Sequence, residues 1–248
     1  YYMPTQQGAG LIAPNADLRP ESSTNFELGA VYEGGRFSAS ATAFYTRFND
    51  KISNAATGML INPETGDIID PLGGAGCNSA ALGPYPGYYC LWQNFNIDNA
   101  VIRGIELSGD WRATDTLSLR GTYTLTDSEQ RSGQFAGFPL QRTPRHRATL
   151  RADWQSPVHG LDFWGAVNYH GAEINAGARI GTAGTPIEIN GQPGRRYDPY
   201  TTVDIGTSYA VNERFSVAAA VYNLLDRAPG VDEVNTGVEG RRFWVGVT

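Results

Sequence analysis

The sequence predicts an all-β fold, part of an antiparallel transmembrane β-barrel, and two observations lead to this prediction. First, nine segments of the 248-residue chain alternate apolar and polar side chains, as strands with one apolar face do. Second, the connections between these segments alternate strictly between long and short. Outer-membrane barrels have short periplasmic turns and long outer loops, whereas a soluble sandwich has no reason to place every long loop at one end.

The nine predicted strands begin near Asn25, Arg36, Val101, Leu117, Arg145, Leu161, Tyr200, Phe215 and Arg241. Tight turns are expected at 33–35, 113–115, 156–160 and 211–213, and long loops at 53–99, 130–143, 171–199 and 226–240. Because long loops face outward, the last strand runs inward and the carboxyl terminus is expected in the periplasm. Nine is an odd number, so at least one upstream strand is expected to complete a closed barrel.

The two faces of each strand differ in chemistry. In the strand from Leu117, the leucines and Tyr123 share one face, while Arg120 and four hydroxyl residues share the other. Comparable apolar rows are Phe26, Leu28, Ala30 and Tyr32; Ala148, Leu150, Ala152 and Trp154; Leu161, Phe163, Gly165, Val167 and Tyr169; Val203, Ile205 and Tyr209; and Phe243, Val245 and Val247. We expect these rows to contact lipid and the opposite rows to face water. The strands of a soluble sandwich also alternate apolar and polar residues, so that fold remains an alternative.

Aromatic residues on the apolar faces gather near the short turns. They are Tyr32, Phe37, Trp111, Trp154, Phe163, Tyr209 and Phe215. We interpret them as a periplasmic aromatic girdle, with the packed end of a sandwich as the alternative. Arg47 and Arg103 interrupt the apolar face near the long loops, where each is expected to reach the outer rim, either as a plainly solvated side chain or beside anionic headgroups.

Composition narrows the possible classes of protein. Apolar residues make up 41% and the mean hydropathy is −0.34, and no apolar run approaches the roughly 18 residues of a membrane-spanning helix. The net charge of −6 argues against nucleic acid as a partner. The amino terminus lacks the basic start and apolar core of a signal peptide, so the true start of an exported protein is expected upstream.

Cys77 and Cys90 lie 14 residues apart, counted inclusively, within one long loop. An oxidising compartment favours a disulfide between them, and two free thiols are the alternative. Two cysteines are too few for a zinc site, and the three histidines are distant in sequence, so no metal or cofactor is expected.

Five segments resemble the carboxy-terminal part of TonB-dependent outer-membrane receptors. They are 15–29 (N-P-x-L-x-P-E-x-S…E-x-G, with Ala16 in place of the proline), 99–107 (A-x-x-x-G-x-E), 143–146 (T-P-x-H), 222–226 (N-L-x-D) and the closing strand 242–247. The resemblance implies the last nine strands of a barrel of about 22, with the plug domain that fills its lumen absent. The family's terminal aromatic residue is also missing after Thr248, and both departures point to a truncated chain.

The resemblance implies import of a scarce nutrient through the bacterial outer membrane, most often an iron–siderophore chelate, driven by the TonB complex through the plug. It also implies polar contacts between plug and lumen. We therefore expect the charged residues of the wet face to contact the plug or to pair with one another: Glu27, Glu106, Asp110, Arg120, Arg147 and Arg151. Nothing resembles a nucleophile with its base or a phosphate-binding loop, so no enzyme is expected.

Ligand contacts are expected from the outer loops. The candidates are Tyr85, Tyr88, Tyr89 and Trp92 in the cysteine-containing loop, and Arg179, Arg195, Arg196 and Arg241 elsewhere. Aromatic rings supply rigid contact area for flat ligands, and arginines attract an anionic chelate, but the rings can equally pack the loop itself. Two other classes of protein stay open: a complete small outer-membrane barrel, and a soluble β-sandwich binding module.

Overall fold

The computed structural model describes residues 5–7, 10–70, 83–133, 135–176, 184–227 and 238–248. The regular elements in these residues are β-strands: β1 (Thr5–Gln7), β2 (Gly10–Ala13), β3 (Ser22–Glu33), β4 (Phe37–Ile61), β5 (Ile68–Ile69), β6 (Tyr89–Arg112), β7 (Leu117–Gln130), β8 (His146–Gln155), β9 (Leu161–His170), β10 (Glu173–Ala176), β11 (Thr185–Ile189), β12 (Gln192–Tyr197), β13 (Tyr200–Asn212), β14 (Phe215–Tyr222) and β15 (Arg242–Val247). None of the described residues forms a helix long and apolar enough to cross a membrane.

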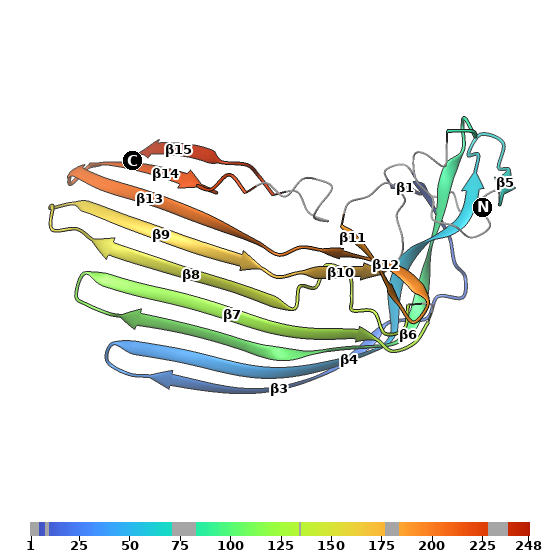
Figure 1. Cartoon of the computed structure of the whole chain (residues 1–248), viewed down its shortest axis with the longest axis horizontal. Coiled ribbons are helices and arrows are strands. Elements are labelled where there is room, and N and C mark those ends of the chain that lie inside the picture. The colour runs from blue at the N-terminus through green and yellow to red at the C-terminus, as the bar shows by residue number, and fades with distance from the viewer. Residues whose placement is uncertain (1–4, 8–9, 71–82, 134, 177–183, 228–237) are drawn as a thin grey trace.

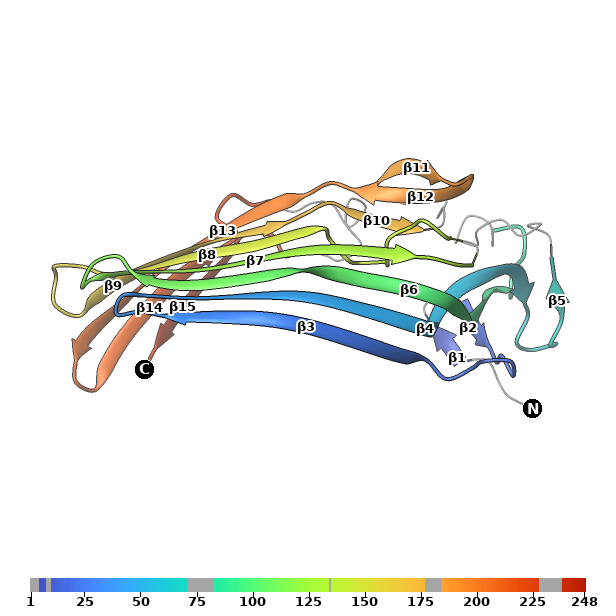
Figure 2. The same cartoon turned by 90° about the horizontal axis from the view of Figure 1, so that it is seen from below.

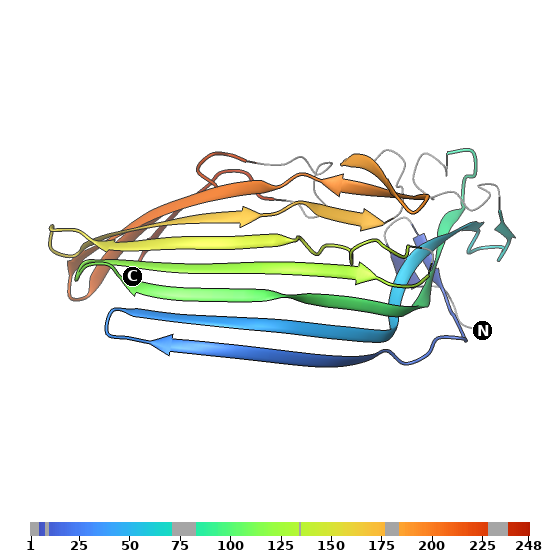
Figure 3. The same ribbon diagram turned by 60° about the horizontal axis from the view of Figure 1, so that its bottom comes forward.

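The nine predicted strands are present and form one curved antiparallel wall. They pair in the order β3-β4-β6-β7-β8-β9-β13-β14-β15, each with its neighbour along this path. All short turns lie at one end of the wall and the long connections at the other, with the carboxyl terminus at the short-turn end (Figures 1 and 3). Figure 2 shows the curvature that bends the sheet into part of a barrel.

Local chemistry explains the short turns. The amide of Gly34 donates to the Phe37 carbonyl at 2.8 Å. The side chain of Asn212 accepts hydrogen bonds from the amides of Arg214 and Phe215 at 2.9 and 3.0 Å, which is an Asx turn. Gly160 has φ of +77°, a conformation that side chains disfavour.

Two of the predicted long loops contain strands, which corrects the sequence-based assignment. β4 and β6 continue past the wall and stay paired as far as Ile61 opposite Tyr89, with an irregular register between Ala56 and Leu60. Residues 173–197 form a separate sheet in the order β10-β12-β11. These strands project beyond the wall, where no face must be apolar, so their sequences lack the alternation that marks the other strands.

The outer face of the wall is apolar and uncovered by any other described element. Leu28, Leu150 and Phe243 on this face are 79%, 54% and 72% exposed. A soluble sandwich would bury such a row in its core, so the structure excludes the sandwich. The predicted girdle residues also lie on this face at the short-turn end, where Tyr32 packs on Phe37 and Trp154 on Phe163 with ring centroids 6.0 and 5.7 Å apart.

Arg47 and Arg103, the two charged residues that interrupt the apolar face, lie toward the long-loop end of the wall, as expected. The Arg103 guanidinium pairs with Asp127 at 2.7 Å, and Arg47 donates to the Asn99 side chain at 3.1 Å. Both therefore have polar neighbours on the wall itself, so neither requires a lipid headgroup.

Candidate functional site

The inner face of the wall carries the charged residues that the sequence assigned to the lumen. The strand register places Glu106 opposite Thr124, and Thr124 opposite Arg147, so a carboxylate and a guanidinium lie at one level, two strands apart. Asp110 pairs with Arg120, and Arg120 with Arg151, in the same way nearer the short turns.

Some of these charges pair with one another. Arg120 Nε donates to Asp110 at 2.6 Å, and Arg151 donates to both carboxylate oxygens of Asp153 at 2.6 to 3.0 Å. Glu27 accepts a hydrogen bond from the Asn25 side chain at 2.6 Å. More than a third of each of these ion-paired side chains is exposed, so the pairs contribute little to stability and mainly neutralise charge.

Glu106 and Arg147 behave differently. Within the described part of the chain, neither forms an ion pair or a side-chain hydrogen bond. Both lie on the inner face of the wall, which also carries Arg120 and Arg151.

The loop aromatic residues form part of a small core in the β4–β6 extension. Leu60 is completely buried and Cys90 is 3% exposed, and Tyr85, Tyr88 and Trp92 pack against this pair. Tyr89 packs against a neighbouring cluster of Leu11, Ile61 and Leu91. All four residues remain half-buried, so each has a structural role and stays partly accessible. Cys77 lies outside the described residues, and its pairing with Cys90 remains a prediction.

Two arginines of the 171–199 connection, Arg195 and Arg196, belong to β12. Arg195 donates to the Gly184 carbonyl at 2.9 Å, and Arg196 pairs with Asp198 at 2.7 Å. Arg196 is 45% exposed. Arg241, in the last long connection, donates to the Leu224 carbonyl at 2.9 Å. Arg179 lies outside the described residues.

Two outer loops dock on each other, which the sequence did not predict. Phe138, from the β7–β8 loop, is completely buried and its ring fills the space above Gly194 of β12, where a Cβ atom would overlap it. Two hydrogen bonds reinforce the contact: Asn190 donates to the Ala136 carbonyl at 3.0 Å, and the Arg142 amide donates to Asn175 at 3.1 Å. The loops therefore form one packed unit above the wall.

A second unpredicted cluster joins this unit to the wall. His170, the last residue of β9, lies 2.7 Å from the Glu173 carboxylate, and Glu173 is only 7% exposed. The Tyr200 ring stacks on His170 with centroids 4.9 Å apart. Glu173 follows His170 by three residues, whereas Tyr200 lies beyond the long connection and is brought to His170 by the pairing of β13 with β9.

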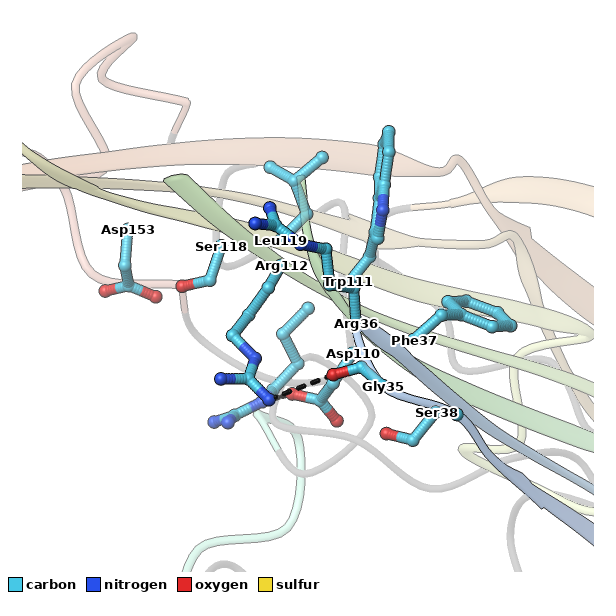
Figure 4. Close-up of a pocket in the computed structure, with 12 residues that line it drawn as sticks. Gly35, Arg36, Phe37, Ser38, Asp110, Trp111, Arg112, Ser118, Leu119 and Asp153 are labelled. Atoms are coloured by element: carbon cyan, nitrogen blue, oxygen red, sulfur yellow. Dashed lines mark hydrogen bonds and ion pairs between the residues drawn. The ribbon is translucent and has the colours of Figure 1, made fainter. Parts of the chain in front are cut away.

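A hollow at the short-turn end is lined by residues from both faces of the wall, including Arg36, Asp110 and Trp111 (Figure 4). Its charges are satisfied locally. Arg36 pairs with Asp115 at 2.5 Å, and Arg112 donates to the Gly35 carbonyl at 3.1 Å, the dashed line in Figure 4. The hollow is therefore explained by the structure of the turns.

Comparison with known proteins agrees with this architecture. A family model described as TonB dependent receptor-like, beta-barrel, matches residues 1–224. An iron-regulated outer membrane virulence protein of Vibrio cholerae serotype O1 is 33% identical over 243 residues, 97% of this chain and 32% of that protein. A ferric enterobactin receptor of Pseudomonas aeruginosa is 26% identical over 213 residues, 86% of this chain and 25% of that protein.

Among solved structures, the siderophore receptor PirA from Acinetobacter baumannii superposes with a TM-score of 0.64 at 20% identity, over 96% of this chain and 33% of that chain. This similarity shows a shared fold. The chain spans about a third of the length of the relatives it matches. An apolar outer face, a polar inner face, turns and loops sorted to opposite ends, and the family match identify the chain as a member of the TonB-dependent receptor β-barrel family, located in the bacterial outer membrane.

Proposed function

We propose that this chain is part of a receptor that imports an iron–siderophore chelate across the outer membrane. The observation that carries the proposal is the wall itself, which sets lipid-facing apolar rows against an inner face of paired and unpaired charges. Such a wall encloses a polar passage. The names of its relatives, an iron-regulated outer membrane protein and a ferric enterobactin receptor, support iron chelates as cargo. The receptor binds and moves its cargo without catalysing a reaction.

The energy for import would come from TonB, acting through a plug domain inside the barrel. Glu106 and Arg147 support a plug, because both project into the lumen without an ion-pair partner among the described residues. A plug carrying complementary charges would satisfy both. The pairs Asp110–Arg120 and Arg151–Asp153 and the residue Glu27 would then line the remaining surface of the lumen.

The outer loops would supply the ligand contacts. The rings of Tyr85, Tyr88, Tyr89 and Trp92 are held by the small core of the extension and keep accessible edges, as pre-organised contact residues do. Arg179, Arg195 and Arg196 would attract an anionic chelate. Of the two described arginines, Arg196 is the more exposed, at 45% of its side chain, although Asp198 offsets part of its charge.

Deleting the gene in its host tests the proposal. Growth on ferric enterobactin as sole iron source, and uptake of the ⁵⁵Fe-labelled chelate, should fall to background and return with the full-length gene. Uptake should also stop when TonB is removed. Uptake that continues without TonB would instead identify a passive pore, and unchanged growth on every iron chelate tested would reject iron import.

A further inference from the structure

Aromatic rings are unevenly distributed over the inner face of the wall. From β3 to β7 that face carries mainly Ser, Thr, Gly and charged residues, and its rings are Phe44 and Phe48. Phe44 lies over Gly104, where a Cβ atom would come within 2.6 Å of the ring, and Phe48 is covered by the Lys51 ammonium at 4.7 Å. From β9 to β15 the same face carries Trp164, Tyr200, Tyr222 and Trp244.

Four flat side chains form a continuous row on this second half, and we call it the inner aromatic row: Arg151, Trp164, Tyr222 and Arg242. The Arg151 guanidinium lies 4.6 Å from the centroid of a Trp164 ring, and Arg242 lies 4.8 Å from that of Tyr222. The two aromatic residues are 6.0 Å apart, measured between ring centroids. The row therefore crosses the wall from β8 to β15.

The row offers flat surfaces and little net charge. Arg151 is neutralised by Asp153 at 2.6 Å, and Arg242 lies 3.4 Å from Glu239. The Trp164 indole lies against Gly206 of the next strand, which has no side chain to lift it from the wall. Trp244 covers Gly246 in a similar way and is 49% exposed. Rings seated against the wall in this way lose little conformational entropy on contact.

The stack of His170 and Tyr200 extends the aromatic surface toward the outer end of the wall. His170 lies six residues from Trp164 along β9, a rise of about 20 Å at the usual spacing in a strand. His170 is held in place by Glu173 at 2.7 Å. A group leaving the outer loops would therefore meet aromatic faces at the top of the wall and again deeper in the lumen.

We infer that the inner aromatic row, together with the His170–Tyr200 stack, is a contact track for planar aromatic groups of the imported chelate, such as catecholate rings. The inference rests on the proposed function and adds the substrate class. Indole, phenol and guanidinium groups all stack on aromatic rings, and the His170–Tyr200 stack and the row lie at two depths of the wall, so they provide two successive weak contacts. Weak, repeated contacts suit passage, because the cargo must also leave each site.

The test uses the full-length receptor and ⁵⁵Fe–enterobactin as the probe. The double variant Trp164→Leu/Tyr222→Leu should slow uptake about 3- to 10-fold, while equilibrium binding by de-energised cells stays within about twofold. Trp164→Phe/Tyr222→Phe should restore uptake, because it keeps the rings. Phe44→Leu is the matched control, since Phe44 also covers a glycine but lies on the other half of the wall, and it should leave uptake unchanged.

Folding of each variant is checked by its heat-dependent shift in gel mobility. If the double variant fails to fold, Tyr222→Leu carries the same expectation. Uptake equal to that of the unmodified receptor, or an equal loss in Phe44→Leu, overturns the inference. If uptake is slow in both the Leu and the Phe variants and a large antibiotic leaks through the barrel, the row serves to seat the plug. This outcome also overturns the inference. Absence of ⁵⁵Fe–enterobactin binding by the unmodified receptor overturns the catecholate class itself, whereas uptake of another iron chelate would leave the proposed function standing.

Discussion

Gly104 of β6 allows the Leu125 carbonyl of β7 and the Phe44 ring of β4 to approach its backbone closely. A Cβ atom at this position would overlap the Leu125 carbonyl oxygen and lie 2.6 Å from the Phe44 ring. The backbone oxygen cannot move without disturbing the β6–β7 pairing that surrounds it. The glycine in this family motif is thus explained by packing.

Gly104→Ala should destabilise the folded full-length receptor by about 1–3 kcal/mol, the usual cost of overpacking. Gly109→Ala is the matched control on the same strand, because its Cβ atom would lie 3.5 Å from the nearest atom, an ordinary contact. The free energy of unfolding in urea from lipid vesicles measures both. Equal stability of the two variants would show that β6 shifts to accommodate the methyl group.

At the level of single residues, the sequence predicted faces but not partners. Alternation predicted Arg120 and Asp110 on one wet face, and the register sets the two residues opposite each other on β7 and β6. Their pairing across strands depends on the length and geometry of a turn, which alternation does not encode. Trp164 and Tyr222 were missed because a tryptophan or tyrosine in a mainly polar row carries no periodic signal, and their contact arises only when β9, β13 and β14 pair.

At the scale of elements, the strands of the wall were predictable and the outer strands were not. Lipid on one side and water on the other impose period-two alternation within the wall. Beyond it, neither face of the β4–β6 extension or of the β10-β12-β11 sheet must meet lipid, and burial comes from local contacts such as that of Phe138 with Gly194. A core of two buried residues, Leu60 and Cys90, with half-buried rings around it is too small to mark the sequence.

Phe138→Ala should release the β7–β8 loop from the β10-β12-β11 sheet. The ring is completely buried, and its removal leaves a cavity that typically costs about 3–5 kcal/mol. Limited proteolysis of intact cells should then cut within 131–145 and 185–197 much faster. Phe135→Ala is the control, because that ring is only half-buried and meets Phe138 edge-on with centroids 5.9 Å apart. Equal protection of both variants would mean that hydrogen bonds alone hold the loops together.

The predicted bridge between Cys77 and Cys90 can be tested at the same scale. In the full-length receptor, denatured without reductant, neither thiol should react with an alkylating reagent, and both should react after reduction. Closing a loop of this length stabilises it by about 3 kcal/mol, so reduction should also speed proteolysis between 62 and 88. Two reactive thiols before reduction would reject the bridge.

At the scale of the whole molecule, the nine-strand wall has two edges. Within the described residues, β3 pairs with β4 alone and β15 with β14 alone. The number, order and sidedness of the wall strands followed from the sequence, because the alternating loop lengths fix which end of each strand faces outward. The curvature of the wall and the docking of the outer loops could not be predicted from the sequence, because both depend on contacts between distant segments.

Residues 1–248 produced alone should neither form a closed barrel nor remain soluble. Every residue of β3 is exposed, including Phe26 at 67% and Leu28 at 79%, so this edge combines apolar side chains with unpaired backbone groups. Each unpaired group costs several kcal/mol in lipid, and in water such an edge pairs with other chains. We expect aggregates in buffer and poor insertion into vesicles, and we expect folded receptor when the remaining barrel strands are supplied in the same chain. Sedimentation and gel mobility measure both states. A monodisperse, folded monomer of residues 1–248 without detergent would show that the apolar rows do not require lipid, and the assignment of an outer, lipid-facing surface would then be wrong.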